Sequence, residues 1–512
     1  MEAFKNLRDF EVAFESSCLT TVLLGRNGTG KSNLLEALVI VLRDLDLGEP
    51  PSFSYRLDYE CRKREIRIDA KPGRKGGPYD IRVDGEPVSL SAFRDAEGRR
   101  FMPSNVFGYY SGPSRRFETH FAKHQEKFYQ QLLKGDAGEA LRPFFFARLI
   151  HSQFVLLAFF YQENNQTAEF LRDYLGVQEL ESVLFVLKEP PRPFRGGDPR
   201  FWNARGAVQA FLSELFERAM APLRLDQRVE VEFAQKKDQE HLYLFLKDRA
   251  ALAGLRAKYD TGGEFFKALE STYLSKVLAE VRIRVQVRDC EGALTFRELS
   301  EGEQQLLTVL GLLRFTREEE ALFLLDEPDT HLNPNWSLRY HALLEQFMGE
   351  EKTSQIIMTT HDPLTVAGLT RDEVRILTRD SESPRITADP PDRDPKGMGV
   401  AGILTSDLFG LRSQLDLATL ELLDEKRDLA SRNILGKKDK ARLSELNRLL
   451  EHQDFAGAVR DPLYSLFVKA MTREGEFRET QTVELTASQR EKRKKIAERV
   501  LKRVLEKWAP KK

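Results

Sequence analysis

Runs of consecutive apolar residues recur along this chain and alternate with segments in which apolar residues lie three or four positions apart. The first run, Leu19–Leu24, leads into a glycine-rich loop, and the NLLEALVIVL that follows has helical spacing. Further apolar runs occur at Ala321–Leu325, Gln355–Thr359 and Val374–Leu377. Strands that are apolar throughout are typical of parallel sheets covered by helices on both faces. The pattern therefore predicts an α/β fold built on a mainly parallel sheet.

A second pattern is the alternation of apolar and polar residues, which predicts half-buried antiparallel strands. It appears in YRLDYEC, REIRIDA and YDIRVDG, and the last of these ends at the turn Asp84-Gly85. We expect an accessory antiparallel sheet there. The stretch 120–220 has mainly helical spacing, interrupted at Pro190–Pro199. Strands are predicted again at RVEVEF, LYLFL and VRIRVQV.

These patterns divide the chain into five expected regions. They are 1–118, the N-terminal part of an α/β body; 119–225, a mainly helical insertion; 226–380, the C-terminal part of the body; 381–403, a Pro- and Asp-rich linker; and 404–512, a helical, charged region. Within the last region, 415–450 predicts a helical hairpin that turns at Gly436. This hairpin is either a docking surface for a partner or a helical cap.

Composition narrows the class of protein. The chain has 512 residues, of which 41% are hydrophobic and 31% charged, as in soluble globular proteins of two or three domains. Its longest apolar stretch, near Phe154–Tyr161, is far shorter than the roughly 18 residues of a membrane-spanning helix, so we expect no membrane partner. Three widely spaced cysteines favour a reducing compartment, and we expect the protein in the cytoplasm. Since the net charge is −1, any nucleic-acid contact must come from a local patch.

The glycine-rich loop Gly25–Ser32, GRNGTGKS, fits the phosphate-binding pattern GxxxxGK[ST]. Glycines allow successive backbone N–H groups to face phosphates, and the following helix adds its positive end. Lys31 is expected to reach the β- and γ-phosphates, and Ser32 to bind Mg²⁺. The alternative is an ordinary glycine-rich strand-to-helix turn. The expected ATP-binding residues are Gly25, Arg26, Asn27, Gly28, Thr29, Gly30, Lys31, Ser32 and Asn33.

Two carboxylates follow the apolar run in Leu322–Glu327. Asp326 is expected to hold Mg²⁺, and Glu327 to orient or deprotonate the attacking water. A lone Asp-Glu pair after a strand is often just a solvated strand end, but here PDTHLNP follows it. His361 comes after the next predicted strand and fits a sensor of the γ-phosphate. We therefore expect Glu327, His361 and Lys31 to carry catalysis.

The motif Leu299–Gln305, LSEGEQQ, precedes the apolar run that ends in Asp326 and Glu327. Its Ser300 and Glu303 also fit an ordinary helix-capping box. With these motifs in this order, the chain resembles ABC-type ATPase heads of the SMC, RecF and OLD group, and KNLRDFEVAF at the N-terminus resembles their opening strands. The matches are Walker A at Gly25–Ser32, the signature at Leu299–Glu303, Walker B at Leu322–Glu327, the D-loop at Asp329–Pro334 and the switch histidine at His361.

The resemblance implies an ABC-type P-loop head that binds ATP and Mg²⁺ and pairs with a second copy. In such a homodimer ATP lies between the heads, and Ser300, Gly302, Glu303 and Asp329 complete the site of the other copy. Two features depart from the family pattern. Glu301 stands where many relatives have Gly or Ser, and the glutamine of the Q-loop has no clear counterpart, with Ser111 and Gln153 as candidates.

The separation between Walker A and signature, 33–298, argues against a transporter ATPase. The intervening stretch has no sustained heptads, which argues against a full-length SMC protein. LLDEPDTHLNPNW, VFGYYSG and PKGMGVAGILTSDLFGL resemble restriction-system-associated ATPases of Septu-type antiphage systems. That resemblance implies a regulatory subunit that acts with a separately encoded HNH-type nuclease. The alternatives are a RecF-like repair ATPase that binds DNA and an OLD-like nuclease.

Several other features were weighed as sites. The DRD sequence Asp392–Asp394 lies in the expected linker, so we interpret it as incidental and do not expect nuclease activity in this chain. His120 and His124 are either metal ligands or, as we favour, exposed polar residues. The basic tail Arg490–Lys512 either contacts DNA or RNA or is an amphipathic helix; its apolar residues are Ile496, Val500, Val504 and Trp508.

Overall fold

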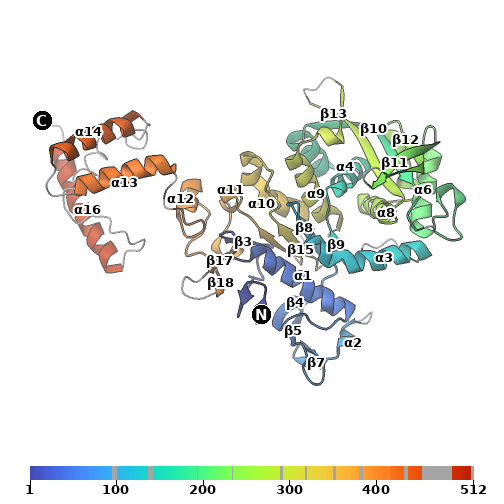
Figure 1. Cartoon of the computed structure of the whole chain (residues 1–512), viewed down its shortest axis with the longest axis horizontal. Helices are drawn as coiled ribbons and strands as arrows, with labels where there is room; N and C mark the ends of the chain where they lie inside the picture. Colours follow the sequence, from blue (N-terminus) through green and yellow to red (C-terminus); the bar gives the residue numbers. More distant parts are fainter. Residues whose placement is uncertain are drawn as a thin grey trace. The chain divides into compact units, whose positions relative to one another are not determined.

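The computed structural model describes most of the chain (Figure 1). The described residues are 1–94, 101–136, 142–162, 164–192, 194–232, 235–288, 292–316, 320–349, 353–379, 385–411, 413, 415–431, 436–452 and 487–508. They fall into two compact units, Met1–Gly410 and Leu411–Lys512. No helix among these residues is both long enough and apolar enough to cross a membrane.

A seven-stranded sheet forms the centre of the first unit, in the order β18-β17-β3-β16-β15-β8-β9. All neighbours are parallel except β18, which is antiparallel to β17. The predicted parallel α/β fold is therefore confirmed. The strands are β18 Ile386–Asp389, β17 Val374–Arg379, β3 Thr20–Gly25, β16 Gln355–Thr359, β15 Leu322–Asp326, β8 Val106–Tyr110 and β9 Phe144–Phe146.

Both faces of this sheet are buried, which explains why its strands are apolar throughout. In β3, Val22 and Leu24 enter one hydrophobic core while Leu23, between them, enters another. Strand β15 divides in the same way, with Leu324 on the second side. Side chains alternate across a strand, so a sheet covered on both faces needs apolar residues at every position. The larger helices of the head are α1 Lys31–Leu47, α9 Glu301–Thr316 and α10 Pro334–Met348.

The accessory sheet is present as expected, in the order β4-β5-β6-β7 with antiparallel pairing. Its alternate residues Ile66, Ile68 and Ile81 pack in one core with Ile40 and Val41 of α1. The sheet therefore braces the helix that follows the glycine-rich loop. Its strands are β4 Tyr55–Cys61, β5 Arg64–Ala70, β6 Tyr79–Val83 and β7 Glu86–Val88.

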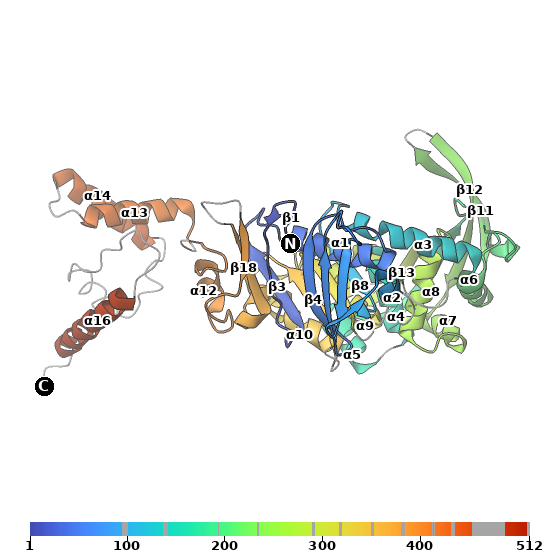
Figure 2. The same ribbon diagram turned by 90° about the horizontal axis from the view of Figure 1, so that it is seen from below.

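A second lobe of the first unit combines helices with a five-stranded antiparallel sheet, ordered β11-β12-β10-β13-β14. The helices are α3 Ala122–Lys134, α4 Ile150–Tyr161, α6 Gly206–Arg218 and α8 Gly262–Leu274. The strands are β10 Val177–Lys188, β11 Leu223–Glu232, β12 Gln235–Leu246, β13 Leu278–Val287 and β14 Ala293–Thr295. Figure 2 shows β11 and β12 projecting beyond the helices of this lobe.

Strand β10 is a correction, because its residues lie in the stretch that we expected to be mainly helical. Its buried residues Val177, Leu180 and Val183 are spaced by three, which resembles a helix. The pairing with β13 shifts register between Val177 and Glu179 and again between Leu180 and Ser182. Such bulges interrupt the two-residue period of a strand, so the sequence pattern no longer alternates.

Strand β18 also departs from expectation, since it lies inside the stretch 381–403 that we expected to be a linker. Its residues Ile386–Asp389 pair with β17, and Ile386 is buried. The remaining short elements of this unit are β1 Ala3–Phe4, β2 Leu7–Arg8, α2 Leu90–Arg94, α5 Asn165–Glu169, α7 Arg249–Ala253, α11 Pro363–Val366 and α12 Gly399–Thr405.

The second unit contains α13 Leu417–Ser431, α14 Lys437–His452 and α16 Ala487–Trp508. Helices α13 and α14 are joined by a fork between the guanidinium of Arg442 and the carboxylate of Glu425, with two contacts of 2.7 Å. On α16, Ile496, Val500 and Val504 are buried, which fits the amphipathic interpretation of the tail. The side chain of Trp508 and the residues 509–512 lie outside the described part of the chain.

Candidate nucleotide-binding site

The loop Gly25–Ser32 connects the end of β3 to the start of α1 at the carboxyl edge of the central sheet. Gly25 has φ 144°, and a Cβ there would lie 2.5 Å from the carbonyl oxygen of Leu377. Only glycine fits this position. No side chain caps the first turn of α1, so its N–H groups face the loop. An uncapped helix N-terminus beside a glycine-rich turn is suited to binding phosphate.

The loop is held in shape by residues far apart in sequence. The carbonyl oxygen of Gly28 accepts from the side-chain amide of Asn6 (2.8 Å) and from the guanidinium of Arg379 (3.2 Å). Asn33 donates to Asn6 at 2.6 Å, and the Thr29 hydroxyl donates to the Arg26 carbonyl at 2.8 Å. Asn6 belongs to the opening segment KNLRDF, whose role in shaping the loop the sequence analysis did not identify. Arg26, Asn27 and Gly28 are exposed.

The side chain of Lys31 folds back over the loop. Its ammonium donates to the carbonyl oxygens of Gly25 (2.8 Å) and Arg26 (3.5 Å). Burial lowers the pKa of Lys31, whereas the nearby carboxylates Glu327 and Asp326 counteract this shift. A cation placed beside free backbone N–H groups is suited to bind an anionic ligand.

Ser32 and Asp326 are 294 residues apart in sequence, yet the serine hydroxyl donates to the Asp326 carboxylate at 3.1 Å. Asp326 also accepts from the Thr359 hydroxyl at 2.6 Å. Burial raises the pKa of Asp326, and the hydrogen bonds from Thr359 and Ser32 act against that rise. A hydroxyl and a carboxylate side by side are oxygen ligands of the kind that Mg²⁺ prefers. These residues therefore fit a magnesium ion.

Glu327 and His361 lie next to each other at the ends of β15 and β16. The imidazole Nε2 is 3.3 Å from the Glu327 carboxylate, and both side chains are partly exposed. Glu327 has φ 54°, an unusual backbone conformation for this residue type, and its N–H donates to the Thr359 hydroxyl at 3.0 Å. Burial and the charge of Lys31 lower the pKa of His361, and Glu327 counteracts them. The imidazole is thus favoured in its neutral form at neutral pH.

The start of α9 carries the signature residues. Ser300 and Glu303 cap the helix reciprocally: the Ser300 N–H donates to the Glu303 carboxylate at 2.6 Å, and the Glu303 N–H donates to the Ser300 hydroxyl at 3.3 Å. A Cβ on Gly302 would lie 2.4 Å from the carbonyl oxygen of His331, so the helix packs tightly on the D-loop of its own head. Among the described residues, no hydrogen bond links Ser300 or Glu303 to the loop Gly25–Ser32. The capping interpretation is confirmed by this geometry.

Asp329 is buried, unlike Ser300, although both were expected to contact the nucleotide of a second copy. It is buried in its own head and accepts a hydrogen bond from the Thr360 hydroxyl. Burial raises its pKa to about 6, although the Thr360 bond opposes that shift. The side chain therefore ties the D-loop to the end of β16 within one copy.

The two candidates for the Q-loop position, Ser111 and Gln153, lie in different parts of the head. Ser111 follows β8, its N–H donates to the Asp326 carbonyl at 3.3 Å, and its hydroxyl lies 3.2 Å from that of Thr330. Gln153 lies on α4 and lines a cavity of about 320 Å³ with Phe296 and Gln304 of the signature region. Only Ser111 lies at the edge of the site with Asp326.

Glu36 is a residue that the sequence analysis missed. It lies one turn after Ser32 on α1, is buried, and forms ion pairs with Lys5, with Arg116 (3.1 Å) and with His120 (3.6 Å). Burial alone would raise the pKa of Glu36, but these partners hold it below its usual value. The signal in the sequence was an acidic residue at the i+4 position from Ser32, on the inner face of an otherwise apolar helix.

The two histidines weighed as metal ligands take part in ion pairs instead. His120 contacts Glu36, and His124 lies 2.8 Å from Asp46 and is stacked on Phe144. His124 is buried, so the favoured interpretation of an exposed residue was wrong for it. No cluster of three or more potential metal ligands occurs in the described residues.

The segment Asp392–Asp394 is anchored locally, because the Asp394 carboxylate accepts a hydrogen bond from the Arg371 N–H at 2.8 Å.

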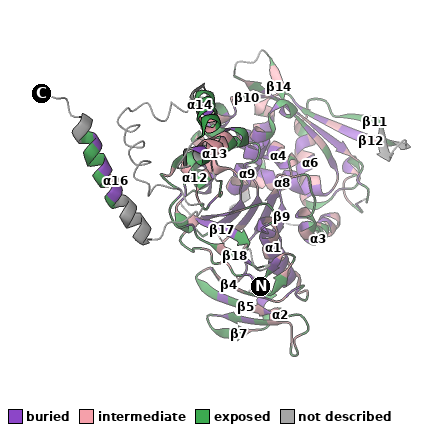
Figure 3. Cartoon of the chain, turned by 60° about the vertical axis from the view of Figure 1, so that its left-hand side comes forward, coloured by how far each residue is buried: buried purple, intermediate pink, exposed green. Residues whose placement is uncertain are grey.

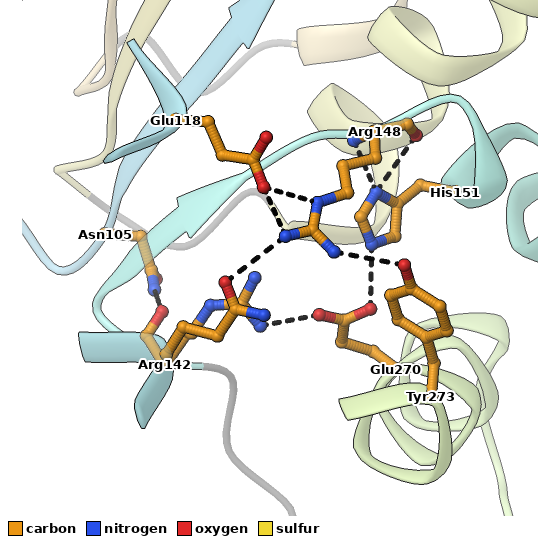
Figure 4. A network of polar contacts seen from close by, with 8 residues as sticks. Asn105, Glu118, Arg142, Arg148, His151, Glu270 and Tyr273 are labelled. Atoms are coloured by element: carbon orange, nitrogen blue, oxygen red, sulfur yellow. Dashed lines mark hydrogen bonds and ion pairs between the residues drawn. The ribbon is translucent and has the colours of Figure 1, made fainter. Parts of the chain in front are cut away.

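A polar network links residues before and on α4 to α8, and Arg142, His151 and Glu270 are its buried members (Figure 4). The Glu270 carboxylate on α8 lies 2.5 Å from Arg142 and 2.8 Å from His151. Arg148 bridges Glu118 (2.8 Å from its Nε) and the Tyr273 hydroxyl (3.0 Å). Burial would raise the pKa of Glu270, but His151 and Arg142 lower it to about 2. The network joins α8 of the second lobe to the segments around β9 and α4.

Glu270→Gln is expected to destabilise the protein by about 3 kcal/mol, because it leaves Arg142 buried without its counter-charge. The pKa of Glu270 falls from its ordinary 4.5 to about 2 on folding, so this stabilisation is present above pH 4.5 and is lost as the pH falls toward 2. Denaturant unfolding across that range measures both effects. Glu60→Gln, on the exposed side of β4, should change stability by less than about 0.5 kcal/mol. Equal stabilities of the two variants would contradict this assignment.

Known proteins match this chain in three ways. A family model described as "AAA domain" matches residues 1–242. A second AAA-domain model, whose description names the AbiEii toxin and Type IV TA systems, matches 286–367. The Septu protein PtuA of Bacillus mycoides strain KBAB4 is 29% identical over 205 residues, which cover 38% of this chain and 28% of PtuA. The match thus spans little more than a quarter of that relative.

Among solved structures, the SMC head domain from Thermotoga maritima matches with 14% identity and a TM-score of 0.29, covering 74% of this chain and 92% of that one. An SMC head bound to the C-terminal winged-helix domain of ScpA has 13% identity and a TM-score of 0.31, covering 74% and 91%. The sheet order and the loop between β3 and α1 fit a P-loop ATPase head, and two AAA-domain models match parts of this chain. Over 205 residues, the chain is similar in sequence to the Septu protein PtuA.

Proposed function

We propose that this protein binds ATP with Mg²⁺ and hydrolyses it to ADP and phosphate. One observation carries the proposal: β3, β15 and β16 bring Lys31, Ser32, Asp326, Glu327 and His361 together at one edge of the central sheet. Ligand sites of α/β proteins lie at this carboxyl edge, where loops from adjacent parallel strands meet. Ser32 and Asp326 would hold the metal ion, which when bound neutralises charge on the β- and γ-phosphates.

The remaining residues act around the γ-phosphate. Lys31 binds the phosphate oxygens, and Glu327 accepts a hydrogen bond from the attacking water and takes its proton. His361 contacts the Glu327 carboxylate at 3.3 Å, and its lowered pKa keeps it available as a neutral hydrogen-bonding group. The φ of 54° at Glu327 supports its assigned role, because strained backbone positions concentrate at functional sites.

We propose that Ser300, Gly302 and Glu303 complete the site of a second copy. Ser300 is exposed at the N-terminus of α9, where backbone N–H groups can bind an anion. The packing of Gly302 against the His331 carbonyl fixes the direction of that helix start. Asp329 has a buried position in its own head, so we assign it to holding the D-loop that contacts the second copy.

The relation to the Septu protein PtuA supports a role in antiphage defence. We propose that nucleotide turnover in this protein controls a separately encoded HNH-type nuclease. The second unit, with its helical hairpin α13–α14, is the proposed docking region, and the basic helix α16 is the proposed contact for DNA or RNA.

The test combines co-purification and turnover. This protein and the HNH product of an adjacent gene should co-purify, and nuclease activity of the pair should depend on the nucleotide added. Phosphate release by this protein alone should be measured with and without DNA across a salt series. Failure to bind the nuclease with or without ATP contradicts the defence role. Strong stimulation of turnover by DNA alone, without a nuclease, would favour the RecF-like alternative.

A further inference from the structure

Strand β11 forms an open edge of the five-stranded sheet of the second lobe. It pairs with β12 on one side, from Leu223 opposite Tyr243 onward. On its other side no strand pairs with it among the described residues. An open edge presents a row of unpaired N–H and C=O groups, and proteins usually block such edges with proline, lysine or a covering segment.

The outer face of this edge is apolar and exposed. Leu223 is 51% exposed, Leu225 46%, and Phe245 on the neighbouring strand 36%. Figure 3 shows exposed stretches on β11 and β12. Leu223 and Leu225 alternate along β11, so they lie on the same face of the sheet as Tyr243 and Phe245. Exposed leucines on an open edge favour the addition of another strand.

The opposite face of β11 carries alternating charges, Arg224, Asp226 and Arg228. Asp226 lies directly opposite Glu240 of β12, which is an unfavourable pairing of like charges. The Glu240 carboxylate is already bound by Arg224 at 2.6 Å. No described residue forms an ion pair with Asp226 or Arg228. Arg228 lies opposite Asp238 of β12, although no ion pair between these two side chains occurs in the described part of the chain. Asp226 faces only a carboxylate across the strand pair, so a further cation beside it would be favourable.

We propose that β11 pairs antiparallel with β11 of a second copy, about a two-fold axis through Gln227. Such a contact is isologous: a residue before the axis in one copy faces the residue equally far after the axis in the other copy, and the reverse also holds. Asp226 then faces Arg228 of the second copy, and Arg228 faces its Asp226. Gln227 faces itself, with four residues of Leu223–Glu232 before it and five after it. The two sheets join into one through main-chain hydrogen bonds.

The neighbouring registers are less favourable. An axis through Asp226 sets that carboxylate against itself and Arg224 against Arg228. An axis through Leu225 sets Asp226 against Arg224, but Arg224 is engaged by Glu240 and stacks on Trp202 at 5.6 Å. The axis through Gln227 instead sets Asp226 against Arg228, whose guanidinium forms no ion pair within the described residues. This contact lies in the second lobe and needs no nucleotide, so it is separate from the proposed ATP-bound pairing of heads.

The mass of the full-length protein in solution tests the contact, with light scattering in the absence of nucleotide. Wild type is expected to form a dimer, and the Lys31→Ala variant should do the same, because the contact does not involve ATP. Asp226→Arg places like charges opposite each other at two points and should give a monomer. Arg228→Asp should do so as well, and the double variant D226R/R228D should restore the dimer. Glu86→Arg, on the exposed edge strand β7, is the matched control and should leave the mass unchanged.

A cysteine cross-link tests the register independently. Directly opposed residues of antiparallel strands have Cα atoms about 4.5–5.5 Å apart, within reach of a disulfide. Gln227→Cys should therefore cross-link two copies on mild oxidation beyond the wild-type background from Cys18, Cys61 and Cys290. Leu225→Cys should not, because the two positions would be about 14 Å apart. A monomeric wild type without nucleotide, a dimer unaffected by Asp226→Arg, or preferential cross-linking at position 225 would each overturn the proposal.

Discussion

Glu327→Gln is expected to lower ATP hydrolysis by about 10²- to 10⁴-fold while ATP is still bound. The amide cannot take a proton from the attacking water, whereas Lys31, Ser32 and Asp326, the proposed ligands of phosphate and metal, are unchanged. Blocked chemistry with intact binding should accumulate the nucleotide-bound pair of heads. Phosphate release measures turnover, and the mass with ATP compared with the mass without it measures the pairing.

Glu60→Gln is a suitable control for this variant, because Glu60 is exposed on β4 of the accessory sheet and belongs to none of the proposed site motifs. It should retain turnover close to that of wild type. A Glu327→Gln protein that hydrolyses ATP at the wild-type rate would show that another group activates the water. If turnover is lost together with ATP binding, Glu327 supports the loop itself rather than the chemical step.

Lys31→Ala is expected to weaken ATP binding by roughly 100-fold, since charge-assisted hydrogen bonds contribute about 1.5–3 kcal/mol each. The substitution removes the ammonium group of Lys31, which donates to the carbonyl oxygens of Gly25 and Arg26 in the same loop. Turnover should fall with binding. Titration with a fluorescent ATP analogue measures the affinity.

Lys247→Ala removes an exposed lysine at the end of β12 and serves as the matched control. Its affinity for ATP should equal that of wild type. Wild-type affinity in Lys31→Ala would contradict the assignment of this loop as the phosphate-binding site. Thermal unfolding of both variants separates a loss of binding from a loss of folding, because bound ATP should raise the melting temperature of wild type and of Lys247→Ala only.

The residues of the candidate site could be identified from the sequence because each lies in a short motif at the end of an apolar run. Gly25 ends β3 and precedes Lys31 and Ser32. Asp326 ends β15 and precedes Glu327, and His361 follows β16. Carboxyl ends of parallel strands meet at one edge of a sheet, so the order of the motifs implied their convergence. The contact between Ser32 and Asp326 at 3.1 Å is the direct result of that topology.

Contacts that depend on pairs of distant residues could not be predicted in this way. Glu36 and its partners Lys5 and Arg116 carry no shared motif, and the Asp46–His124 pair is 78 residues apart. The bulges of β10 gave a strand the spacing of a helix, so local periodicity predicted the wrong element. Ion pairs and bulges are set by neighbours across space, which a single sequence does not display.

By itself, the sequence determined the α/β class, the phosphate-binding loop and the residues expected to carry the chemistry, because local patterns encode strands, helix starts and glycine-dependent turns. The tertiary structure alone decided which polar residues pair, where β10 and β18 lie, and that β11 has a strand on only one side among the described residues. The physical reason is that burial, ion pairing and sheet order arise from packing between segments far apart in the chain. Local periodicity indicates only that a segment has an apolar face, whereas tertiary packing determines which other segment covers that face.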